Sequence, residues 1–130
     1  MKKFLLLPLL VLGIVTAAEA EVTRAETMQG LVQGLNTIQK GIMYNNGDIV
    51  KQGVDAIKKN AKNIDSFDIE DDKTNSFKAK RFAETEAKAL AKLADEIEIG
   101  FSKHDKNRVL DTYRRMQNQC INCHKIIRKW

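Results

Sequence analysis

The chain has 130 residues and a mass of 14.7 kDa, which is enough for one domain with an apolar core but not for two. Its 22 basic and 17 acidic side chains leave a net charge of +5, which is too mild to favour nucleic-acid binding. Two cysteines are too few for the disulfide framework of a small secreted domain, so they require another explanation.

Residues 1–20 resemble a cleavable secretory signal peptide. Lys2 and Lys3 precede an apolar run at 4–15, and small residues follow up to Ala20. The run is short for a membrane span, so we expect export to the periplasm as a soluble protein, with no stable membrane insertion after cleavage. The single proline of the chain lies in this segment, so residues 21–130 contain none. This argues against an all-β fold built on proline-marked turns.

Apolar residues recur every three or four positions from residue 22 to 44, which predicts an amphipathic helix. A turn signal follows at 45–47, and Asp48 is expected to cap a second helix at 48–64. Gly30 and Gly34 either let the first helix approach a cofactor or another helix closely, or only weaken it. The predicted inward residues are Met28, Leu31, Val32, Leu35, Ile38 and Ile42 in the first helix, and Val50, Val54, Ile57, Ala61 and Ile64 in the second.

The polar stretch 65–75 is predicted to be a long connection. A third helix is expected at 76–99 with Gly100 placed to end it, and Asp105 is expected to cap a fourth helix at 105–129. The predicted inward residues are Ala83, Ala87, Leu90, Leu93, Ala94 and Ile97 in the third helix, and Val109, Tyr113, Met116, Cys120, Cys123 and Ile127 in the fourth. Four such helices give an all-α, antiparallel four-helix bundle, a fold that holds cofactors between facing helices.

Cys120, Cys123 and His124 form a Cys-x-x-Cys-His motif, the pattern of covalent haem c attachment. On a helix the two thiols lie close to one face, where each can add across a vinyl group of haem to form a thioether. The His124 imidazole projects from the same face and can bind the iron from the proximal side. Export agrees with this interpretation, because bacteria assemble haem c outside the cytoplasm. The sequence therefore predicts one covalently bound haem c.

Three other interpretations of the motif are weaker. A zinc site would need a fourth ligand, and the other histidine of the chain, His104, is expected on a surface turn. A thioredoxin-type redox pair lies at a helix N-terminus in an α/β fold, whereas this pair is near the end of the last helix. Two buried free thiols with a core histidine would leave unreacted thiols in an oxidising compartment.

The position of the motif, near the C-terminus of an all-helical chain, resembles that in the class II c-type cytochromes, the cytochrome c-prime family. Members commonly carry a basic residue four positions after the histidine ligand, and Arg128 matches it. The family also places a basic residue four positions before the residue that faces the distal side of the haem, and Arg24 and Met28 match this pattern. The resemblance implies that Met28 is the distal residue, and Arg24 is a candidate partner of a haem propionate.

The distal residue distinguishes two functions. A methionine ligand, as in the low-spin members, saturates the iron and suits electron transfer, whereas an apolar non-ligand leaves a five-coordinate iron that binds nitric oxide or carbon monoxide. Because residue 28 is methionine, we expect a one-electron carrier ligated by His124 and Met28, with the gas-binding protein as the alternative. Met43 and Met116 are expected to lie too far from the distal position. No distal histidine or acid supports an enzyme, and the expected partners are periplasmic redox proteins, with a homodimer left open.

Overall fold

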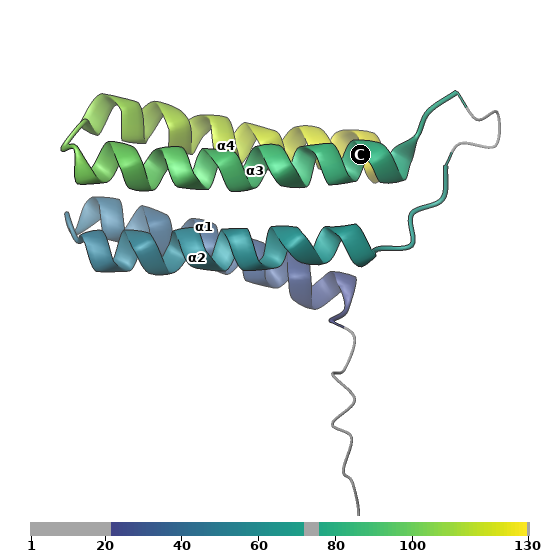
Figure 1. Ribbon diagram of the computed structural model, residues 1–130, viewed down its shortest axis with the longest axis horizontal. Helices are drawn as coiled ribbons and strands as arrows, with labels where there is room; N and C mark the ends of the chain where they lie inside the picture. The colour runs from purple at the N-terminus through teal and green to yellow at the C-terminus, as the bar shows by residue number, and fades with distance from the viewer. Residues whose placement is uncertain (1–21, 72–75, 130) are drawn as a thin grey trace, which may run out of the picture.

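The computed structural model describes residues 22–71 and 76–129. Its elements are α1 (Arg24–Met43), α2 (Gly47–Asn63), the short 3-10 helix η1 (Ile64–Ser66), α3 (Ala79–Ser102) and α4 (Lys106–Ile127). Figure 1 shows the four long helices packed alongside one another, and the prediction of an all-helical four-helix fold is confirmed. The predicted signal peptide at 1–20 lies outside the described residues. Across the described ranges, no helix combines the length and apolar character that a membrane span requires.

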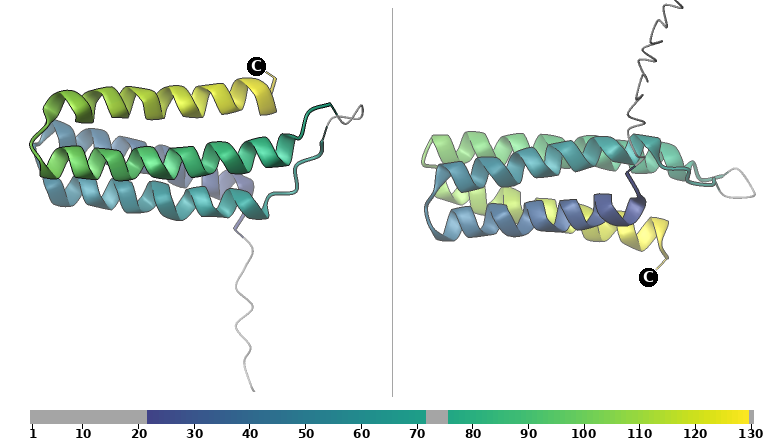
Figure 2. Two further views of the ribbon diagram at one scale, coloured as in Figure 1. Left: turned by 45° about the horizontal axis from the view of Figure 1, so that its top comes forward. Right: turned by 90° about the horizontal axis from the view of Figure 1, so that it is seen from below.

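Each helix packs on the next helix of the chain, so α1 lies on α2, α2 on α3 and α3 on α4. Between α1 and α4, the Tyr113 hydroxyl donates a hydrogen bond to the Leu35 carbonyl oxygen at 3.3 Å. Figure 2 shows that the start of α1 and the end of α4 lie at the same end of the bundle, which is also where the connection between α2 and α3 emerges. Residues far apart in the sequence therefore meet at this end.

The predicted inward stripes form most of the core. All the apolar residues expected to face inward from α2, η1 and α3 are buried. Val32 of α1 was predicted to be inward but is 56% exposed, and this prediction is wrong. The reason is that Val32 lines a cavity between the helices instead of the packed core, together with Met28 and Leu35, which are only partly buried. The buried residues of α1 are Thr27, Leu31, Gly34, Ile38 and Gly41.

A capping box fixes the start of α1. The Thr23 hydroxyl accepts a hydrogen bond from the Glu26 backbone N–H at 3.2 Å, and the Thr23 N–H donates to the Glu26 carboxylate at 2.8 Å. The pKa of Glu26 is lowered because the Thr23 backbone N–H and the Thr23 hydroxyl both donate to its carboxylate and so favour the charged form. Arg24 thus becomes the first helical residue, and Met28 lies one turn further along α1.

The predicted cap of α2 and the predicted end of α3 differ from the structure. The Asn46 side chain, rather than Asp48, caps α2 by accepting a hydrogen bond from the Ile49 N–H at 3.1 Å. Gly100 does not end α3, which continues to Ser102. Gly100 is instead a buried helical position, where an added Cβ would lie 3.1 Å from the Val109 side chain. The chain turns at His104, which has φ 56° and is exposed, as expected for a surface turn.

Asp105 caps α4 as predicted, by accepting a hydrogen bond from the Arg108 N–H at 3.0 Å. At the other end of α3 the helix begins later than predicted, at Ala79, and Lys78 supplies no side-chain cap. Because no capping side chain marks the start of α3, this boundary was difficult to predict from the sequence.

Glycines allow α1 and α2 to approach closely. A methyl group added at Gly53 would lie 2.6 Å from the backbone nitrogen of Ile38 and 2.8 Å from the carbonyl oxygen of Gly34. At Gly41 it would lie 2.6 Å from the backbone nitrogen of Val50. Gly30 and Gly34 also face α2, so of the alternatives for this pair the structure supports close helix packing.

We expect Gly53→Ala to destabilise the protein by about 1–3 kcal/mol, because the added methyl group meets backbone atoms that can move only if the two helices separate. Gly47→Ala is the matched control, since its Cβ would be 3.5 Å from the nearest Phe101 atom and the helical propensity improves. Denaturant unfolding followed by circular dichroism measures both. Equal midpoints for the two variants would contradict the close-packing explanation.

Thr27 is fully buried in α1, and its hydroxyl has no hydrogen-bond partner among the described residues. A buried hydroxyl without a partner costs about 1–3 kcal/mol. We therefore expect Thr27→Val to raise the free energy of unfolding by about 1 kcal/mol, since valine keeps the shape of the side chain. Thr37→Val is the control, because the Thr37 hydroxyl donates to the Gln33 carbonyl at 2.8 Å, and its loss should bring no gain. A less stable Thr27→Val variant would show that this hydroxyl has a partner.

Candidate functional site

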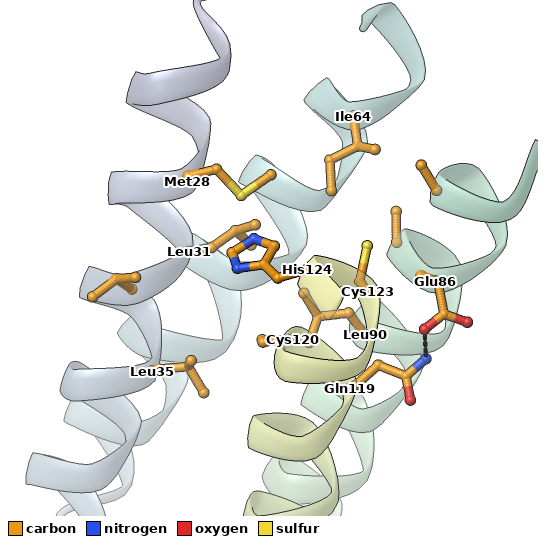
Figure 3. Close-up of a pocket in the computed structure, with 13 residues that line it drawn as sticks. Met28, Leu31, Leu35, Ile64, Glu86, Leu90, Gln119, Cys120, Cys123 and His124 are labelled. Atoms are coloured by element: carbon orange, nitrogen blue, oxygen red, sulfur yellow. Dashed lines mark hydrogen bonds between the residues drawn. The ribbon is translucent and has the colours of Figure 1, made fainter. Parts of the chain in front are cut away.

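The predicted site residues meet at the end of the bundle where α1 begins and α4 ends. Met28 from α1 and Cys120, Cys123 and His124 from α4 line one cavity between the helices, here called the inner cavity. Figure 3 shows the Met28 side chain and the His124 ring extending from opposite helices into the same region. The sequence separated these residues by most of the chain, and the antiparallel fold brings them together.

The inner cavity, of about 90 Å³, opens into a wider space of about 540 Å³, here called the mouth. The two share Met28, Cys123 and His124, and Arg24 and Arg128 lie at the mouth. Together they are in the size range of cofactor and small-molecule pockets, about 300–1,000 Å³. All the residues singled out by the haem interpretation therefore border one connected space.

Arg24 lies at the rim of the mouth and is exposed. Its guanidinium carbon is 5.8 Å from the centroid of the Phe67 ring, which is within the range of a cation–π contact. Phe67 is buried and follows η1, so this contact links the start of α1 to the connection after η1. A cation fixed at the rim can meet an anionic group that projects out of the cavity.

The walls of the inner cavity are apolar. Its wall residues are Leu31, Val32 and Leu35 from α1, Ile64 from η1, and Ala83, Ala87 and Leu90 from α3. Such walls exclude water and strengthen electrostatic interactions inside the cavity. They suit a large, flat, apolar group better than a hydrated ion.

The small size of Ala83 and Ala87 contributes to the space opposite Cys123. Further along α3, the inward stripe contains Leu90, Leu93 and Ile97, which fill the core. The two alanines in this part of the stripe were visible in the sequence, but the periodicity argument treated all six stripe residues, Ala94 included, as core positions. The cavity was therefore not predicted.

Both cysteines are free thiols and are partly buried. Burial raises the pKa of Cys120, and it raises the pKa of Cys123 to about 11 with a further contribution from the negative charge of Glu86. Thiols of dithiol redox enzymes have lowered pKa values. The direction of these shifts is the opposite of that in a thioredoxin-type site, and both cysteines line the apolar cavity.

The other methionines are unsuited to the site. Met43 is the last residue of α1, at the opposite end of the bundle, and is 76% exposed. Met116 is fully buried in the core. Neither borders the inner cavity or the mouth, whereas Met28 borders both. Among these residues, Met28 is positioned opposite the α4 motif.

A hydrogen bond between α3 and α4 was not anticipated. The Gln119 side-chain amide donates to a Glu86 carboxylate oxygen at 2.6 Å, and both residues line the inner cavity (Figure 3). Burial raises the pKa of Glu86. Neither residue stands out in the sequence, because charged and amide side chains are common on the polar faces of these helices.

Comparisons of this chain with protein-family models, with curated proteins and with solved structures found no match. The interpretation of the site therefore depends on its own residues and their arrangement.

Proposed function

We propose that this protein is an exported, monohaem c-type cytochrome of the class II kind that carries single electrons. In this proposal Cys120 and Cys123 hold the haem by thioether bonds, His124 is the proximal iron ligand and Met28 is the distal ligand. The observation that carries it is the meeting of Met28 with the Cys-x-x-Cys-His motif of α4 across one apolar cavity.

The donor set fits haem c. Two thiols three positions apart on one helix and a histidine beside them match the attachment pattern, and each thiol can add its S–H across a vinyl group without an oxidant. The apolar walls and the small residues Ala83 and Ala87 accommodate an apolar ring. At the mouth, Arg24 and Arg128 provide cations for the propionates.

Haem supplies a one-electron couple when it is bound, and the protein supplies the environment. Met28 and His124 together provide a nitrogen and a sulfur donor, a combination that raises the reduction potential of c-type cytochromes. The leucines of α1 and α3 exclude water from the inner cavity. We assign no catalytic residue, and the proposed partners are electron donors and acceptors of the periplasm.

Optical spectra of the purified, exported protein test this proposal, in the oxidised and reduced forms and with carbon monoxide. We expect a sharp low-spin spectrum in the reduced form, a methionine-to-iron charge-transfer band in the oxidised form, and little response to carbon monoxide. A broad high-spin spectrum that shifts strongly with carbon monoxide would favour the gas-binding alternative. A colourless exported protein would exclude both.

A further inference from the structure

Glu86 is the acidic residue that lines the inner cavity in the described part of the chain. It projects from α3 beside Cys123, and its carboxylate accepts the 2.6 Å hydrogen bond from Gln119, the residue immediately before Cys120. The bond keeps the carboxylate at the cavity edge and directed toward α4. Because the walls around it are apolar, the electrostatic field of its charge is only weakly screened inside the cavity.

The other charges near the site differ from Glu86 in two respects. Asp68 and Glu70 lie at the mouth together with Arg24 and Arg128, so charges of both signs are present there. All four are exposed, so water and salt weaken their fields, whereas Glu86 is half-buried. Glu86 is therefore the least exposed of the carboxylates that line the inner cavity and the mouth.

The position of this carboxylate fixes the sign of its effect. A negative charge at the edge of an apolar cavity favours a positive centre inside the cavity, because apolar walls screen the interaction weakly.

We propose that Glu86 sets the reduction potential of the site by holding a negative charge at the cavity edge that stabilises the oxidised form. This inference rests on the proposed function, because it concerns the one-electron couple of a bound haem. The oxidised form carries one more positive charge than the reduced form, so the Glu86 carboxylate lowers the potential. Gln119 is a positioning residue that keeps the carboxylate in place.

Glu86→Gln tests the proposal, because glutamine keeps the size of the side chain and can still accept the bond from Gln119. Glu84→Gln is the matched control, because this substitution changes the net charge by the same amount. Glu84 also lies on α3 and is half-buried, but it lines neither the inner cavity nor the mouth. The measurement is an optical redox titration of each full-length exported holoprotein at pH 8. Spectra of both variants show whether the iron ligands are retained.

We expect Glu86→Gln to raise the midpoint potential by about 30 mV or more, which is roughly a threefold change in the ratio of reduced to oxidised protein at 59 mV per tenfold. Glu84→Gln should shift it by less than half as much. Gln119→Met, which removes the donor and keeps the carboxylate, should also shift it less than Glu86→Gln.

Equal shifts for Glu86→Gln and Glu84→Gln would overturn the inference, since any lost surface charge would then have the same effect. An equal rise in Gln119→Met would also overturn it, because the hydrogen bond rather than the charge would be responsible. In both cases the normal haem spectrum would leave the proposed function intact. A protein without covalent haem would reject the function itself and the inference with it.

Discussion

We expect that replacing both Cys120 and Cys123 with alanine gives a protein from which acid acetone extracts all the haem, whereas the unaltered protein should retain it. The reason is that the two thioether bonds are the covalent links in the proposed site, and both thiols border the inner cavity. His124 and Met28 can still bind iron in the double variant, but coordination bonds to iron break in acid when the histidine is protonated. The effect is therefore complete rather than partial.

Asn122→Ala is the control for this experiment, because Asn122 lies between the cysteines and is exposed. It should retain all its haem after extraction. Mass spectrometry of the denatured proteins gives an independent measurement, since the unaltered chain and Asn122→Ala should both carry the added mass of one haem. Covalent haem in the double alanine variant would reject the assigned attachment sites.

We expect Met28→Ala to convert the proposed low-spin electron carrier into a protein that binds carbon monoxide in the reduced state. Removing the thioether opens the distal coordination position, and alanine offers no replacement ligand. The reduced spectrum should become high-spin, and the charge-transfer band of the oxidised form should disappear. Met28 is only partly buried, so we expect the loss of packing to cost less than the 2–5 kcal/mol of a fully buried methionine.

Two further variants separate ligation from packing. Met28→Leu keeps an apolar side chain of similar size and should show the same spectral change as Met28→Ala. Met43→Ala makes the same substitution on the same helix, at a residue that is 76% exposed, and should leave the spectrum unchanged. If Met28→Leu keeps the low-spin spectrum and still fails to bind carbon monoxide, another residue must be the distal ligand.

The sequence was sufficient to predict the four helices. For most of them it also predicted which face packs into the core. Periodicity succeeded because helices in a bundle bury one stripe each, as the residues of α2 and α3 do. It failed at Val32 because this residue lines the inner cavity instead of the packed core and is 56% exposed. The prediction that Gly100 ends α3 also failed, because this glycine lies within the helix, where it allows close packing against Val109.

The residues proposed for the site were chosen from the sequence, and the structure places them around one cavity, while their surroundings were not predicted. The Cys-x-x-Cys-His motif is a local pattern, and Met28 followed from the family resemblance, so neither required knowledge of the packing. Glu86 and Gln119 are distant in the sequence and have ordinary polar side chains, and they became part of the site only through the contact of α3 with α4. Contacts of this kind depend on helix rotation and register, which a single sequence does not specify.

The location of the inner cavity between the first and last helices also bears on the order of folding. Neighbouring helices in the chain pair through short loops, so the α1–α2 and α3–α4 hairpins close with little loss of chain entropy. The α1–α4 contact joins segments such as Leu35 and Tyr113, which are 78 positions apart, and is therefore among the last to form. If haem is attached as proposed, the cysteine motif would be accessible on a partly folded chain, and the packing of α1 with Met28 would then enclose it.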